Sequence, residues 1–132
     1  MVVAAHVSLT DKDSQGYKFF TLLAEKYGVS KDNWNPYAMM GLNQSLLAVR
    51  AVEHAARKVG VAKLTGQAVY DAMFEAPFTS DELQGTLPTL TFTKEAPFCT
   101  KDLKVIIETV KDGKYIKATP DWIPAITDVS KW

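Results

Sequence analysis

The side chains best suited to acid–base chemistry in this sequence are two histidines, His6 and His54. Histidine titrates near neutral pH and can therefore act as a general acid or base, or bind a metal ion. His6 ends a short apolar run, and ends of strands often line clefts, so a role in a cleft and a structural role are equally consistent with its position. His54 lies among charged residues of a predicted helix, which favours a solvated surface histidine. The two histidines belong to different predicted elements and do not indicate a shared site.

The single cysteine, Cys99, follows Pro97 and Phe98 and carries no local signature of a catalytic nucleophile. A small, half-buried thiol is the favoured interpretation. One cysteine excludes an intrachain disulfide and a metal site built from several thiolates. Glycine-rich phosphate loops are absent from the sequence, and the acidic pair Asp81-Glu82 is typical of a cap or a solvated turn. We therefore expect no enzymatic activity, no cofactor and no bound metal.

Aromatic and sulfur-containing side chains gather where the longest predicted helix begins. Tyr37 lies just inside this helix, with Trp34 before it and Met39 and Met40 after it. Packing in the core is the favoured interpretation of this spacing. In the alternative, the N–H groups of the helix start and the ring of Tyr37 would form one wall of a site for a small anionic or zwitterionic ligand.

The helices that position these residues are indicated by hydrophobic spacing and by capping residues. The spacing predicts helices over residues 14–27, 36–59 and 65–75, after a buried strand at residues 2–7. The second helix is apolar nearly all round in its first half, which predicts burial there and an amphipathic second half. We expect it to continue without a break through Gly41.

The carboxy-terminal part of the sequence is predicted to be mainly extended. A cap and a short turn are expected at residues 79–82, followed by an extended segment at 87–94. Strand-like runs at 103–110 and 114–119 are joined through Lys111-Asp112-Gly113, and an aspartate–glycine pair in this setting predicts a hairpin. A strand, three helices and further strands indicate the α/β or α+β class.

Composition narrows the classes of protein to which the chain can belong. Its 132 residues suffice for one domain with a core, and 47% hydrophobic and 23% charged residues are typical of a globular protein. Basic and acidic residues number 15 each, and this balance argues against nucleic acid as a partner. No apolar run approaches the roughly 20 residues of a membrane helix, and the start of the chain lacks the features of a secretory signal.

Four segments in a fixed order resemble the type I periplasmic solute-binding proteins of branched-chain amino acid transporters. The long helix opens with Asn-Pro-Tyr-Ala-Met-Met-Gly-Leu-Asn-Gln at residues 35–44 and closes with Ala-Ala-Arg-Lys-Val-Gly at 55–60. The other segments are Leu-Thr-Gly-Gln at the start of 64–73, the run 83–92 ending in Pro-Thr-Leu-Thr-Phe, and Val-Lys-Asp-Gly-Lys at 110–114 with the later Asp121-Trp122. In the family a Tyr-Asp-Ala run stands where this chain has Leu42-Asn43-Gln44, so any role of that aspartate is missing or altered.

The resemblance implies an α/β fold that contains part of a Rossmann-like, three-layer lobe with a parallel sheet. The two ends of the chain would supply strands to a second lobe. Residues 1–10 would be a strand and hinge of the second lobe, 11–105 the carboxy-terminal portion of the first lobe, and 106–132 a second-lobe hairpin and tail. Tyr37 corresponds to an aromatic position against the ligand, and His6 is a weaker candidate at the cleft-facing end of a strand.

The implied function is that of the solute-binding component of an ABC importer, present as a carboxy-terminal fragment, outside the cytoplasm in the periplasm or extracellular space. An amino acid or a related small carboxylate would be bound by hinge closure and handed to a membrane permease. The alternative is a standalone α/β interaction module that assembles without transporting a ligand. In both cases we expect the isolated chain to form a homo-oligomer, most simply a two-fold dimer, because apolar side chains at the start of the long helix would otherwise be exposed.

Overall fold

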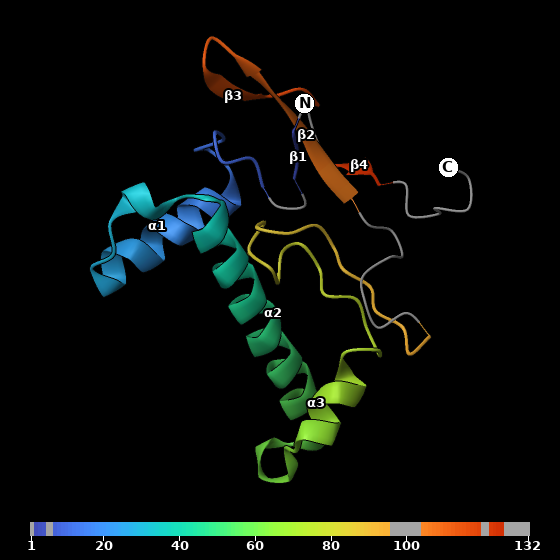
Figure 1. Ribbon diagram of the computed structural model, residues 1–132. Coiled ribbons are helices and arrows are strands. Elements are labelled where there is room, and N and C mark those ends of the chain that lie inside the picture. Colours follow the sequence, from blue (N-terminus) through green and yellow to red (C-terminus); the bar gives the residue numbers. More distant parts are fainter. Residues whose placement is uncertain (1, 5–6, 96–103, 120–121, 126–132) are drawn as a thin grey trace.

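A computed structural model describes residues 2–4, 7–95, 104–119 and 122–125, and these form a mixed α/β structure (Figure 1). In Figure 1, α1 lies beside the start of α2, α3 lies at the other end of α2, and the strands form a separate layer. The elements are β1 (Val2–Ala4), α1 (Gln15–Tyr27), η1 (Lys31–Asn33), α2 (Pro36–Val59), η2 (Val61–Lys63), α3 (Gly66–Ala72), β2 (Lys104–Lys111), β3 (Lys114–Lys117) and β4 (Ile123–Pro124).

Helix α1 lies within the predicted range of residues 14–27 and is capped at both ends. The Ser14 side chain accepts a hydrogen bond from the Tyr17 N–H at 3.2 Å, and Gly28 ends the helix in the left-handed conformation at φ +68°. The connection to α2 is held by Trp34, whose indole Nε1 donates to the Leu9 carbonyl at 2.8 Å. The Trp34 ring also meets the Tyr17 ring edge-on, with 5.2 Å between centroids. The start of α2 therefore rests on a fixed aromatic support.

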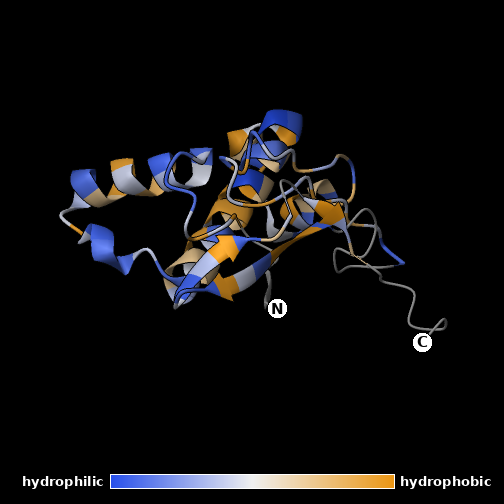
Figure 2. Ribbon diagram, turned by 90° about the horizontal axis from the view of Figure 1, so that it is seen from above, coloured by the Kyte–Doolittle hydropathy of each residue, from blue (hydrophilic) through white to orange (hydrophobic). Residues whose placement is uncertain are grey.

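Helix α2 is one continuous helix of 24 residues, as predicted, and is not interrupted at Gly41. Burial in its first half is confined to one face, however, so the prediction of burial nearly all round is wrong. Met39 is fully buried and Leu46 almost so, whereas Tyr37 is 84% and Met40 55% exposed. An apolar side chain becomes buried only where another element covers it, and none of the described elements covers this flank. Figure 2 shows polar and apolar residues side by side along the helices. This pattern is typical of helices with one buried face.

The main core lies between α2 and the irregular segment that follows α3. This segment, residues 76–95, runs back beside α2 (Figure 1) and carries one antiparallel bridge between Phe78 and Leu90. Helix α3 follows its cap Thr65, where the predicted helix begins, but ends three residues before the predicted residue 75. The buried members of the core are Leu46, Ala51, Phe78, Leu83 and Leu90.

Every strand pairing in the described residues is antiparallel, and the parallel sheet implied by the resemblance is not seen there. Strand β2 pairs with β1, with β3 and, nearer its start, with β4. The predicted hairpin is confirmed: β2 and β3 are joined by Asp112 at φ +51° and Gly113 at φ +73°. Two consecutive positive φ angles match the right-handed twist of a two-residue hairpin turn.

The loop between β1 and α1 links the sheet to the helices. Ser8 is buried and donates a hydrogen bond to the buried carboxylate of Glu108 on β2. Lys117 on β3 pairs with Asp11 at 3.0 Å, and this hydrogen bond is the main cause of a lowered pKa of the Asp11 carboxyl. The two links hold both strands of the hairpin against residues 8–11.

Candidate functional site

Tyr37, the first predicted site residue, lies at the exposed start of α2 and does not pack in the core. The N–H groups of Tyr37 and Ala38 both donate to the Asn35 side-chain oxygen at 3.0 Å, and the Met39 N–H donates to the Asn35 carbonyl. Pro36 has no N–H, so the first turn of the helix retains no free donor. The alternative interpretation of this helix start is therefore wrong in one respect: its N–H groups are already bonded to Asn35 and are not available to a ligand.

The second predicted site residue, His6, lies outside the residues that the structure describes, as does Cys99. Nothing in the described structure therefore bears on the cleft role that the sequence suggested for His6.

His54 is largely buried, which overturns its interpretation as a solvated surface residue. Its side chain is only 14% exposed, and Nε2 lies 2.8 Å from Oε1 of Glu82. The imidazole also stacks on the Phe78 ring, with 4.8 Å between centroids and 4° between planes. His54 comes from α2, whereas Phe78 and Glu82 come from the segment after α3. No local pattern around His54 could indicate these partners.

The Glu82 carboxylate is held in place by a reciprocal cap with Thr79, as the predicted cap at residues 79–82 requires. The Thr79 N–H donates to Glu82 Oε2 at 3.0 Å, and the Glu82 N–H donates to Thr79 Oγ1 at 3.2 Å. The hydrogen bond from His54, followed by that from the Thr79 N–H, lowers the pKa of Glu82 to about 2, although partial burial opposes the change. Glu82 is therefore ionised at neutral pH.

Two arginine side chains lie near the His54–Glu82 pair, but neither forms a close ion pair with the Glu82 carboxylate. Arg50 donates from Nε to the Glu82 carbonyl at 2.8 Å and pairs with Glu53 at 2.6 Å. Arg57 lies farther off, with nitrogens 3.6 Å from Glu53 and 3.8 Å from Glu82. Both separations exceed hydrogen-bonding range. The guanidinium of Arg57 is thus attracted to the carboxylates, and no hydrogen bond to another described residue engages its donors.

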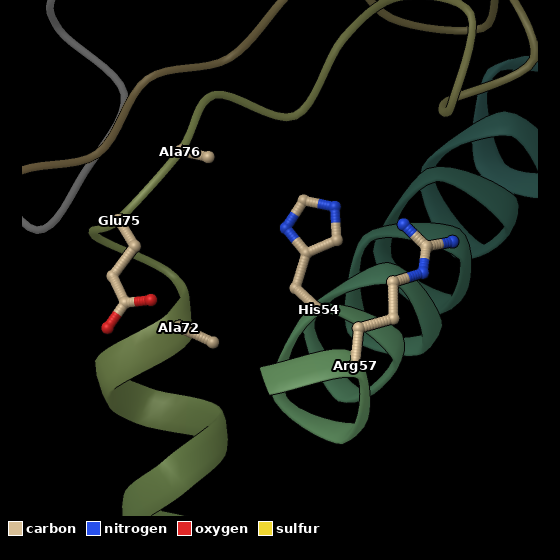
Figure 3. A pocket seen from close by; sticks show the side chains of 5 residues that line it. All are labelled: His54, Arg57, Ala72, Glu75 and Ala76. Carbon is tan, nitrogen blue, oxygen red and sulfur yellow. The ribbon is translucent and has the colours of Figure 1, made fainter. Parts of the chain in front are cut away.

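A hollow of about 240 Å³ opens beside His54, between the second half of α2 and the end of α3 (Figure 3). In Figure 3 the imidazole projects from α2 toward the segment that carries Glu75 and Ala76. Glu75 forms an ion pair with Lys58 across this region. The hollow is lined by His54, Arg57, Ala72, Glu75 and Ala76.

Acid is expected to weaken the folded state through Glu82. Its pKa lies below the ordinary 4.5, so the stabilisation is complete above about pH 4.5 and is lost as the pH falls toward 2. The side chain is 28% exposed, and water screens part of the interaction. Between pH 6 and pH 2, the free energy of unfolding should fall by about 1–2 kcal/mol less in Glu82→Gln than in wild type. Urea unfolding at several pH values measures this, and the exposed Glu95→Gln variant is the control; equal pH dependence of wild type and Glu82→Gln would contradict it.

Two open apolar grooves flank α2. One of about 370 Å³ lies toward α3, and the other of about 200 Å³ lies toward α1. Under the first half of the helix, the buried Asn43 Oδ1 has no hydrogen-bond partner among the described residues. The groove toward α3 includes Leu47, Ala48, Val52, Val69 and Met73, and the groove toward α1 includes Phe19, Leu23, Leu42 and Val49.

In the described part of the chain, no three His, Cys, Asp or Glu side chains are grouped so that they could hold a metal ion. None of the helices described is both long and apolar enough to cross a membrane. No protein-family model matches the chain, and no curated protein or solved structure shows significant similarity to it.

Proposed function

We propose that the chain belongs to the solute-binding component of an ABC importer and helps to bind an amino acid or a related small carboxylate. The observation that carries this proposal is the placement of Tyr37. Tyr37 is 84% exposed on the first turn of a 24-residue helix whose start is capped by Asn35. An exposed aromatic side chain is suited to cover one side of a small ligand. The order of the four resembling segments supports the same function.

The proposal divides the chain between two lobes. The three helices would belong to a Rossmann-like lobe, and the two ends of the chain to a second lobe. Support comes from the pairing of β1 with β2, which joins segments about 100 residues apart in one small sheet. The loop at residues 8–11, bonded to Glu108 and Lys117, would then lie at the hinge. Such a protein would work in the periplasm or outside the cell and deliver its solute to a membrane permease.

Removal of the Tyr37 ring is expected to weaken solute binding by at least tenfold, because a buried aromatic contact contributes about 1.5–3 kcal/mol. The protein should be isolated from its source cells through a carboxy-terminal tag, so that it is tested as the cell makes it. Tryptophan fluorescence would be titrated with the common amino acids and small carboxylates, for wild type, Tyr37→Ala and the control Tyr37→Phe. We expect wild type and Tyr37→Phe to bind a shared solute. Failure of wild type to bind any, or equal binding by Tyr37→Ala, would contradict the proposal.

A second candidate function is self-assembly as an interaction module. The two apolar grooves that flank α2 favour it, because burial of apolar surface contributes a favourable free energy of about 25 cal/mol for each Å² removed from water. In a solution of the pure chain, a second copy is the only protein that can cover these grooves.

A further inference from the structure

A hollow of about 310 Å³ lies where the loop before α1, the first turn of α1 and the connection to α2 meet. Neither Tyr37 nor His54 lines it, so it is separate from the surfaces described above. Its lining combines apolar, aromatic and charged side chains, namely Leu9, Lys12, Tyr17, Lys31, Asp32 and Trp34.

The aromatic side of this hollow is restrained by its own packing. The Tyr17 ring meets the Trp34 ring edge-on, and Phe20 packs against the same indole, each with 5.2 Å between centroids. Trp34 Nε1 donates to the Leu9 carbonyl at 2.8 Å, which holds the indole in place. The Tyr17 hydroxyl has no hydrogen-bond partner in the described part of the chain and can donate to a ligand.

Two ammonium groups lie near the Tyr17 ring. Lys12 Nζ is 6.0 Å from the ring centroid, and no carboxylate of the described residues lies within ion-pair distance of it. Lys31 Nζ pairs with Glu25 at 2.7 Å, which engages one of its three hydrogens. This hydrogen bond is the main cause of a raised pKa of the Lys31 ammonium, and the Tyr17 phenol adds a smaller electrostatic contribution. Both lysines are exposed, and their flexible stems let the ammonium groups move toward a ligand beside the phenol.

The donors around Tyr17 match the chemistry of a phosphate group. A phosphate monoester carries nearly two negative charges near pH 7 and has three strong acceptor oxygens. Lys12, Lys31 and the Tyr17 hydroxyl supply two positive charges and three donor groups. A carboxylate offers only two oxygens and one charge. Leu9 and Trp34 are partly buried and offer apolar surface to a short carbon skeleton.

We propose that this hollow binds a small phosphate monoester, whose phosphate group accepts a hydrogen bond from the Tyr17 hydroxyl and is held by the ammonium groups of Lys12 and Lys31. Asp32 is the lining group that opposes an anion. Its Oδ2 accepts from the Ser30 hydroxyl at 3.3 Å, and its charge should lower the affinity for phosphate. The proposal goes beyond the binding of a carboxylate at Tyr37, and either can fail while the other holds.

Comparison of three related probes tests the proposal on the full 132-residue chain. Glycerol 3-phosphate carries the phosphate, glycerate has a carboxylate in place of the phosphorylated carbon, and glycerol is uncharged. Titration calorimetry at constant ionic strength should show glycerol 3-phosphate binding roughly 5–10-fold more tightly than glycerate, as the additional charge predicts. Equal or tighter binding of glycerate, or no binding of glycerol 3-phosphate, would overturn the proposal. So would binding only to vesicles of phosphatidic acid, which present the same group on a membrane.

Three variants test the roles of the lining side chains. Lys12→Gln should weaken the binding of glycerol 3-phosphate about 3–10-fold through loss of a charge. Tyr17→Phe keeps the ring against Trp34 but removes the hydroxyl donor, and a loss of about 3–10-fold is expected. Asp32→Asn should tighten binding, because it removes a charge of the same sign as the ligand. Weaker binding in Asp32→Asn, or unchanged binding in both of the other variants, would refute the assignment.

Lys63→Gln is the matched control for the loss of a lysine. Lys63 is exposed on η2 and does not line the hollow, so this variant should bind glycerol 3-phosphate as wild type does. Equal losses in Lys12→Gln and Lys63→Gln would show a general effect of net charge and would contradict a site in this hollow. In wild type, the amide shifts of Lys12 and Tyr17 should respond to the ligand, and their failure to change would contradict it as well.

Discussion

Replacement of Phe78 by alanine is expected to lower the free energy of unfolding by about 3–5 kcal/mol. Phe78 is fully buried, stacks on His54, and meets Phe92 edge-on with 6.0 Å between ring centroids. It also belongs to the core that joins α2 to the irregular segment after α3. Removal of the ring would leave a cavity and expose the imidazole, and urea unfolding followed by circular dichroism measures the loss.

Tyr37→Ala is the matched control for this substitution, since it also removes an aromatic ring. Tyr37 is 84% exposed, so its loss should change the unfolding free energy by no more than about 0.5 kcal/mol. Phe78→Leu, which fills part of the space, should give an intermediate value. Similar effects of Phe78→Ala and Tyr37→Ala would show that Phe78 does not lie in the core.

The isolated chain is expected to self-associate at micromolar concentration, and a charge placed in a groove beside α2 is expected to shift it toward the monomer. Val49 and Val52 line opposite grooves and are 51% and 41% exposed. Lysine at either position would place an ammonium in an apolar interface, where burial of an unpaired charge is strongly unfavourable. Sedimentation velocity of wild type, Val49→Lys and Val52→Lys identifies which groove is used.

Val61→Lys provides the control for these variants. Val61 is 80% exposed on the short helix η2 and lines neither groove, so this change should leave the association constant unaltered. A wild-type chain that sediments as a compact monomer throughout the micromolar range would contradict the prediction. Equal dissociation by all three lysines would point to a general effect of charge instead of a specific groove.

Features that depend on near neighbours in the sequence were predictable. The caps at Ser14 and Asn35, the stop at Gly28 and the Asp112-Gly113 turn each act within a few residues. Helices α1 and α2 and the β2–β3 hairpin, which these residues begin or end, were therefore predicted with nearly correct ends.

Features that depend on distant partners were not predictable from local pattern. His54 was expected to be solvated because charged residues surround it in sequence, yet Phe78 and Glu82 bury it from 24 and 28 positions away. Apolar composition could not indicate that only one face of the first half of α2 would be covered. The parallel sheet was an expectation from family resemblance, and the pairing of β1 with β2 depends on contacts across about 100 residues.

Native mass spectrometry of the protein isolated from its source cells most directly tests whether it is a solute-binding protein. We predict one small carboxylate per molecule, either carried through purification or acquired on incubation with amino acids and short carboxylates. The Tyr37→Ala variant should lose this solute, and His54→Gln should keep it, because His54 lies about 26 Å away along α2. A wild-type protein that binds no solute from the whole set would contradict the proposed function.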